Sequence, residues 1–209
     1  MPTPTVRRSR AVPRRQPTRA RVLAAARDHA IRYGWRQARV QDIAKDAGVS
    51  RPTLYKDFPS KQELGEALVL DQVDVFLGEL ITVLDGSKPT VRDCVRNAVE
   101  FTLAEAERGP FLAAVLTEEA TATEGLLPLI AGQAVSVPAL AAQALTPWFL
   151  HRFPEVPRHT VVFLVDVAVR LSISYLAGPP SISREETAEE VGALVEAYVD
   201  VALAEAGTA

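Results

Sequence analysis

Residues 40–64 read VQDIAKDAGVSRPTLYKDFPSKQEL and contain the signals of a helix, a turn and a second helix. Apolar residues three and four positions apart predict a short first helix with one apolar face, made of Val40, Ile43, Ala44 and Ala47. Gly48 follows at the point where a helix ends in a left-handed residue, a conformation that glycine adopts without steric cost. The stretch therefore opens with a helix and a glycine turn.

A second short helix is predicted after the turn. Ser50 is placed to cap it, and Pro52 in its first turn removes no intrahelical hydrogen bond. Leu54 and Phe58, four residues apart, share one face and point back toward the first helix. We interpret the pair as a helix-turn-helix, whose outer face has the chemistry to bind DNA and carries Arg51, Thr53, Tyr55 and Lys56.

The residue types of that face indicate separate contacts. Arg51 has the donor fork that matches O6 and N7 of guanine. Pro52 and Thr53 can touch a thymine methyl group, whereas Tyr55 and Lys56 are expected to hold phosphates, which fixes the register without reading bases. The predicted DNA-binding set is Arg39, Ser50, Arg51, Pro52, Thr53, Tyr55, Lys56 and Lys61.

A long helix is expected directly after this unit. Ser60 with Glu63 three residues later is a capping box, and an apolar stripe then continues as far as Gly86. Lys61 stands beside the positive end of this helix, where a phosphate oxygen is favoured both by the helix dipole and by the ammonium group.

The charge is divided unevenly along the 209 residues. Residues 1–61 hold 15 Lys and Arg against 4 Asp and Glu, whereas residues 62–209 hold 8 against 22. A basic head on an acidic body is typical of a polyanion-binding module joined to an effector domain. Residues 1–17 are rich in Pro and Arg, and we expect a disordered arm that either lies along DNA or serves as a solubilising tail.

Residues 43–64, IAKDAGVSRPTLYKDFPSKQEL, resemble the signature of TetR-family transcriptional regulators in their IA, AGVS, TLY, F and SK-x-x-L elements. The resemblance covers roughly residues 20–64. It implies an all-α protein of about nine helices, with a three-helix DNA-binding domain (residues 18–62) and a larger helical domain for ligand binding and dimerisation (residues 63–209).

Two positions depart from the family pattern. Ala30 stands where the family usually has phenylalanine, so the head is expected to pack differently. Arg39 stands where the family tends to have Thr or Ser, which caps the second helix and touches phosphate. Arginine cannot cap the helix, but its guanidinium can pair with a phosphate.

Helical periodicity predicts further elements on both sides of the motif. Thr18 is placed to cap a first helix that ends at Gly34, and Trp35 is expected to pack in the core. Five helices are predicted after Gly86, at residues 89–106, 110–122, 126–153, 157–177 and 183–206. The third of these contains Pro128, Pro138 and Pro147, which we expect to break or kink it.

The helix predicted at residues 157–177 is apolar nearly all round, so it needs cover on both sides. Together with residues 183–206 it resembles the family's dimer interface, a four-helix bundle with two helices from each subunit. The alternative is a central helix enclosed within a monomer. Because Asp166 and Arg170 interrupt its apolar run, we do not expect it to span a membrane.

The resemblance implies a cavity for a small-molecule effector among the middle helices. Phe101, Phe111, Trp148 and Phe149 are candidates to line it, and plain core is the alternative for each. Arg170 lies one helical turn after Asp166, which favours a buried ion pair; the alternative is a charged anchor for an acidic ligand. An apolar pocket would suit a hydrophobic effector such as an acyl chain, a steroid or a drug.

No catalytic, metal or cofactor site is expected. The three histidines lack metal-ligand spacing, and there is no phosphate loop, nucleophile elbow or dinucleotide fingerprint. The single cysteine, Cys94, fits a buried structural thiol and a reducing cytoplasm, and no signal peptide is recognised.

These features lead us to expect a cytoplasmic, homodimeric repressor that binds a palindromic double-stranded operator and is released by a small, apolar effector. Within the same class, the alternatives are a ligand-dependent activator and a regulator that needs its ligand to bind DNA. From another class, the alternative is an architectural DNA-binding protein of low specificity. A helical carrier or enzyme with a vestigial head is disfavoured by the intact recognition face.

Overall fold

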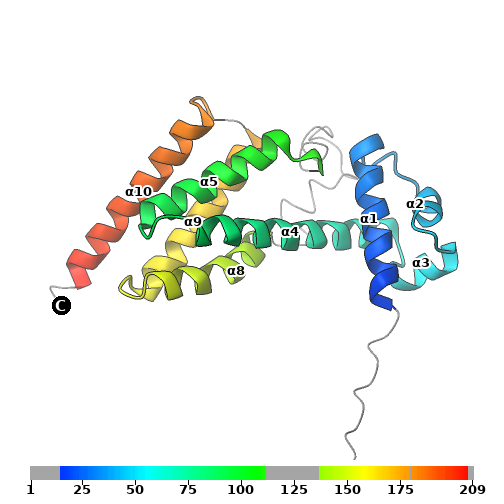
Figure 1. Ribbon diagram of the computed structural model, residues 1–209, viewed down its shortest axis with the longest axis horizontal. Helices are drawn as coiled ribbons and strands as arrows, with labels where there is room; N and C mark the ends of the chain where they lie inside the picture. Colours follow the sequence, from blue (N-terminus) through cyan, green and yellow to red (C-terminus); the bar gives the residue numbers. More distant parts are fainter. Residues whose placement is uncertain (1–14, 112–136, 179, 207–209) are drawn as a thin grey trace, which may run out of the picture.

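The computed structural model describes residues 15–111, 137–178 and 180–206, and within them it contains eight helices and no strand (Figure 1). The predicted all-α class is confirmed. The helices are α1 (Arg15–Tyr33), α2 (Val40–Asp46), α3 (Arg51–Asp57), α4 (Lys61–Asp85), α5 (Val91–Arg108), α8 (Val137–Arg152), α9 (Arg158–Ala177) and α10 (Arg184–Ala206).

The helices form two groups joined by one long helix. We call α1, α2 and α3 the head, and α5, α8, α9 and α10 the body (Figure 1). The 25-residue helix α4 begins beside the head and runs into the body, where it contacts α5 and α8. In the body α10 lies along α5, and α9 lies along α8. The last residues of α10 lie at the end of the molecule opposite the head.

Several helix ends are set by the local signals that the sequence contains. Gly34 and Gly48 have φ angles of 75° and 65°, the left-handed conformation expected after α1 and α2. The Ser60 hydroxyl accepts a hydrogen bond from the Glu63 N–H at 3.0 Å and caps α4 as predicted. These short-range signals place the ends of α1 and α2 and the start of α4 correctly.

Two boundary predictions are wrong. Helix α1 begins at Arg15, so Thr18 lies within its first turn instead of capping it. Pro17 is compatible with that start, because the first four N–H groups of a helix have no intrahelical partner. Helix α8 also continues through Pro147 instead of breaking there. The predicted helix at 110–122 lies outside the described residues apart from its first two positions, as do residues 126–136 and the arm before residue 15.

Two apolar cores stabilise the fold. The head core joins α1, α2, α3 and the first turns of α4, and it includes Ala30 and Trp35, 1% and 3% exposed. The body core joins the rest of α4 to α5, α8, α9 and α10. Val73 of α4 packs against both cores, so the two cores meet along α4.

Helix α9 is long and apolar enough, by length and composition alone, to cross a membrane. In the fold it packs against α5, α8 and α10, and Arg170 Nε donates to Asp166 Oδ2 at 2.8 Å on its surface. Only 22% of its most apolar window is buried, and two large apolar side chains of α9, Val162 and Phe163, are exposed, at 45% and 52%.

Candidate DNA-binding surface and ligand cavity

The turn between α2 and α3 has the geometry that the sequence predicts. After α2, the Val49 N–H donates to the Ala44 carbonyl at 2.9 Å, which closes the turn around Gly48. The Ser50 hydroxyl accepts a hydrogen bond from the Thr53 N–H at 3.3 Å and caps α3. Pro52 occupies the first turn of α3, where proline is tolerated. The helix-turn-helix is therefore present, with its predicted caps.

Burial divides the two short helices into an inner and an outer face. Ile43, Leu54 and Phe58 are at most 2% exposed and hold α2 and α3 against the head core. The opposite side of α3 is exposed and displays the predicted set of Arg51, Pro52, Thr53, Tyr55 and Lys56. The side chains proposed to face DNA therefore do not pack in the head core.

Some of these outer side chains contact one another. The hydroxyl groups of Ser50 and Thr53 lie 2.8 Å apart and share a hydrogen bond, so both serve the start of α3. Arg51 donates through Nη2 to Oε1 of Gln41, a residue of α2 that sequence reasoning did not single out. Nothing local predicts this contact, because the two residues are ten positions apart and meet only once the turn has formed.

The two predicted basic residues outside α3 lie at helix starts. Arg39 occupies the position before α2 with extended backbone; its side chain makes no capping hydrogen bond and is exposed. Lys61 begins α4, and its ammonium group donates to the Arg36 carbonyl at 3.0 Å and lies 5.5 Å from the Trp35 ring centre. Lys61 is therefore tied to the segment between α1 and α2.

A second contact that the sequence did not indicate fastens α1 to α2. The His29 ring nitrogen Nε2 lies 2.8 Å from Asp46 Oδ2, and the His29 ring packs against Tyr33 with centroids 5.4 Å apart. His29 is buried, at 8% exposed. We assign it to the stability of the head.

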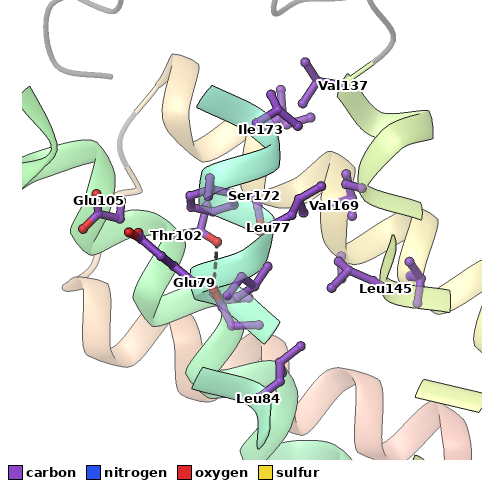
Figure 2. A pocket seen from close by; sticks show the side chains of 18 of the residues that line it. Leu77, Glu79, Leu84, Thr102, Glu105, Val137, Leu145, Val169, Ser172 and Ile173 are labelled. Atoms are coloured by element: carbon purple, nitrogen blue, oxygen red, sulfur yellow. Dashed lines mark hydrogen bonds between the residues drawn. The ribbon is translucent and has the colours of Figure 1, made fainter. Parts of the chain in front are cut away.

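A cavity of about 310 Å³ lies among α4, α5, α8, α9 and α10. Leu77 of α4, Leu145 of α8, and Val169 and Ile173 of α9 point into it (Figure 2). Its lining is mostly apolar. The polar exceptions include Glu79, Glu105, Ser172 and Thr102, whose hydroxyl is already bonded to the Ala98 carbonyl at 2.8 Å. Such a cavity suits an apolar ligand.

Of the five predicted pocket residues, Phe111 and Phe149 line the cavity. Phe101 lies outside the lining and stacks on Phe76, with ring centroids 5.4 Å apart, and Phe76 itself lines the cavity. Trp148 is also outside, since its indole N–H donates to Asp85 Oδ1 at 2.8 Å.

Arg170, the fifth predicted pocket residue, forms the expected pair with Asp166, but the prediction of a buried pair is wrong. The Arg170 side chain is 65% exposed and lies outside the cavity lining. The pair raises the pKa of Arg170, chiefly through its hydrogen bond to Asp166. The two residues therefore form a surface ion pair along α9.

The cavity touches the head core directly. Phe111, which follows α5, is 8% exposed and belongs to the head core, yet it also lines the cavity. Val69 of α4, which is 1% exposed, has the same double membership. Arg27 of α1 reaches the cavity wall from the head. A molecule in the cavity would therefore contact side chains that hold the head in place.

A helix-turn-helix head with an exposed basic face, joined by one helix to an apolar cavity, defines the class of helix-turn-helix transcriptional regulators. Family comparison gives the same result. Residues 22–68 match the model of bacterial regulatory proteins of the tetR family, and residues 91–197 match that of the bacterial tetracyclin repressor C-terminal domain. The chain belongs to the TetR family of transcriptional regulators.

Individual relatives agree with this assignment. The HTH-type transcriptional regulator AlkX of Mycobacterium tuberculosis (strain ATCC 25618 / H37Rv) is 27% identical over 192 residues, which are 90% of each chain. The TetR family repressor AlkX from Dietzia sp. strain DQ12-45-1b, described as implicated in biodegradation of n-alkanes, superimposes with a TM-score of 0.71 at 22% identity. The match covers 88% of this chain and 96% of that chain.

A TetR transcriptional regulator from Rhodococcus sp. RHA1 has a TM-score of 0.54 at 24% identity, covering 87% of this chain and 95% of its own. At these identities, the solved structures establish the shared fold.

Proposed function

We propose that this TetR-family protein is a homodimeric repressor that binds a palindromic operator in the cytoplasm and is released from it by a small apolar effector. The observation that carries the proposal is that Phe111 and Val69 belong to the head core and also line the cavity. Occupancy of the cavity and the position of the head are thereby linked through shared side chains.

The DNA-binding half of the proposal rests on the outer face of α3. A single short helix makes few base contacts, so a specific site requires two heads, one for each half of an inverted repeat. Arg51 is the proposed guanine reader, and Thr53 and Pro52 face thymine methyl groups. Tyr55, Lys56, Arg39 and Lys61 are the proposed phosphate contacts, which give affinity that falls with salt.

Dimerisation is supported by an apolar face on α9 and α10. Five large apolar side chains on these helices are between 45% and 62% exposed: Val162, Phe163, Leu194, Tyr198 and Val201. Phe163 and Tyr198 contact each other across the two helices, and an exposed apolar patch of this kind marks an interaction site. A second copy covers it in our proposal, which also supplies the second head.

The effector is proposed from the chemistry and shape of the cavity. The lining follows α4 from Val69 to Leu84, a rise of about 22 Å, so the space is long as well as apolar. An elongated hydrocarbon or acyl chain fits such a space better than a compact polar metabolite. A ligand that binds better to the arrangement in which the heads do not fit DNA lowers the affinity for DNA. By reciprocity, DNA lowers the affinity for the ligand by the same coupling free energy.

In vitro selection from randomised duplex DNA at about 150 mM salt tests the DNA-binding half. An enriched inverted repeat is the expected result. Binding without enrichment that collapses as salt rises would instead favour the architectural alternative.

The selected operator then serves to test the effector half. Linear alkanes, alkanols and alkanoic acids of increasing length are titrated into the protein–operator complex and followed by fluorescence anisotropy. Release by one class within a range of chain lengths is the expected result. Tighter operator binding in its presence would identify a co-repressed regulator or activator instead, and no effect of any member would contradict an elongated apolar effector.

A further inference from the structure

A side-chain contact between the two short helices of the head bears on how bases are read. Arg51, the first residue of α3, donates through Nη2 to Oε1 of Gln41, the second residue of α2. Both side chains are exposed on the outer side of the helix-turn-helix. The contact therefore lies on the surface proposed to face DNA, not in the core that holds the two helices together.

The backbones that carry the pair are fixed independently of it. Helix α2 is anchored by Ile43 and Ala44, at most 1% exposed, and α3 by Leu54, at 1%, and by the Ser50 cap. We therefore expect both helices to keep their positions when the contact is removed. What the contact adds is the direction of the Arg51 guanidinium, which would otherwise sample many rotamers at an exposed site.

The contact leaves Arg51 able to read a base. A guanidinium has five N–H donors, and Gln41 takes one, so four remain, of which O6 and N7 of a guanine need two. Gln41 is also neutral, so it orients the arginine without cancelling its charge. A carboxylate at the same place would hold the guanidinium as well but would neutralise it, which would weaken its attraction to DNA.

We propose that Gln41 is a positioning residue for base readout: it holds the guanidinium of Arg51 in the orientation from which Arg51 reads guanine. This inference rests on the proposed function, because it concerns specificity for an operator. It assigns the base preference at one position to a pair of residues on two helices, instead of to Arg51 alone.

The first test concerns the free protein and needs no operator. In ¹⁵N NMR of the arginine side chains, Arg51 of the wild-type dimer is expected to show restricted guanidinium motion. Gln41→Ala should release it, whereas Gln62→Ala, which removes an exposed glutamine at the start of α4, should not. Equal Arg51 motion in wild type and Gln41→Ala would overturn the inference, whatever the protein binds.

The second test is operator selection with wild type, Arg51→Ala, Gln41→Ala, the double variant and Gln62→Ala. Arg51→Ala should lose the guanine preference at one base pair of each half-site. Gln41→Ala should reduce the preference at that same base pair by roughly 2- to 12-fold, the range expected from freeing one long side chain. The double variant should match Arg51→Ala, and Gln62→Ala should match wild type.

The affinity for a duplex that lacks the operator shows whether Gln41 orients Arg51 or contributes to DNA binding of any sequence. Gln41→Ala should bind such a duplex as wild type does, whereas Gln41→Glu should bind it more weakly because the charge of Arg51 is cancelled. A changed preference at a different base pair in Gln41→Ala would mean that Gln41 reads a base itself, and would overturn the inference. If wild type selects no repeat at all, the proposed function fails, and this inference fails with it.

Discussion

The rings of Phe163 in α9 and Tyr198 in α10 lie with their centroids 5.5 Å apart, and both residues are about half exposed, at 52% and 46%. An aromatic pair at this separation is favourable. Because about half of each side chain is still in contact with water, much of the free energy of burying the two rings is not gained within one chain. The pair is therefore the natural centre of the proposed interface between two copies of the chain.

Phe163→Glu should convert the proposed dimer to a monomer at micromolar concentration, because it would bury a charged carboxylate within the proposed four-helix interface. Light scattering coupled to size-exclusion chromatography measures the mass directly. Ile182→Glu is the matched control, since Ile182 is 49% exposed but precedes α10 and lies outside the apolar face. A Phe163→Glu protein that remains dimeric would place the interface elsewhere.

Filling the cavity should block the proposed effector site. Val165 of α9 is 6% exposed and lines the cavity, so Val165→Trp should reduce the affinity for the neutral apolar dye Nile red at least about tenfold. The comparison is Ile182→Trp, which adds the same side chain at an exposed site. Unchanged dye affinity in Val165→Trp would show that the dye binds outside this cavity.

Two helical glycines should respond oppositely to alanine. A Cβ on Gly192 would lie 2.9 Å from the Arg92 carbonyl oxygen where α10 packs against α5, whereas a Cβ on Gly78 meets nothing within 4 Å. Gly192→Ala should lower the free energy of unfolding by about 1–2 kcal/mol, and Gly78→Ala should raise it by roughly 0.5–1 kcal/mol. Urea unfolding at one protein concentration measures both; an equal gain in the two variants would mean that α10 moves aside without cost.

Cys94 should be unreactive in the native protein. Burial raises the pKa of its thiol, so the thiolate that attacks a disulfide reagent is disfavoured until the chain unfolds. Because the folded thiol holds its proton more tightly than the unfolded one, stability should fall as pH rises above about 8.5, the ordinary value for cysteine. Labelling with Ellman's reagent tests the first point, and Cys94→Ala should remove the corresponding part of the pH slope.

Arg39 should contribute affinity without specificity. Its side chain is exposed before α2 and caps nothing, which leaves it for a phosphate. Arg39→Gln should weaken binding to all duplexes alike and reduce the slope of log affinity against log salt by about 1. Arg158→Gln, at the start of α9 in the body, should change neither quantity. A loss confined to the operator would instead assign Arg39 to base readout.

The parts of the fold that follow from near neighbours in the chain could be predicted. The turn glycine Gly48 and the caps at Ser50 and Ser60 act within three or four residues, so the sequence alone placed the helix-turn-helix. Errors arose where tertiary packing decides. Helix α8 passes through Pro147 because Leu145 and Phe153, on either side of it, are both held in the body core.

The site divides in the same way. Residues exposed on α3 follow from helical periodicity, because the buried Leu54 and Phe58 determine which side is left over. The cavity wall does not follow from periodicity: Phe76 and Phe101 stack on each other, and only the packed structure makes Phe76 the one that lines the space. The Gln41–Arg51 contact likewise requires the turn to bring two helices together.

The unbroken course of α4 gives the molecule the mechanics of a rigid lever. Its 25 residues span about 37 Å without a proline or a loop between head and body. A tilt of about 5° at the body end would carry the head end about 3 Å, close to the 3.4 Å rise of one base pair. In the proposed mechanism, a bound molecule that tilts α4 by this small angle would displace the head by a distance comparable to one base-pair step.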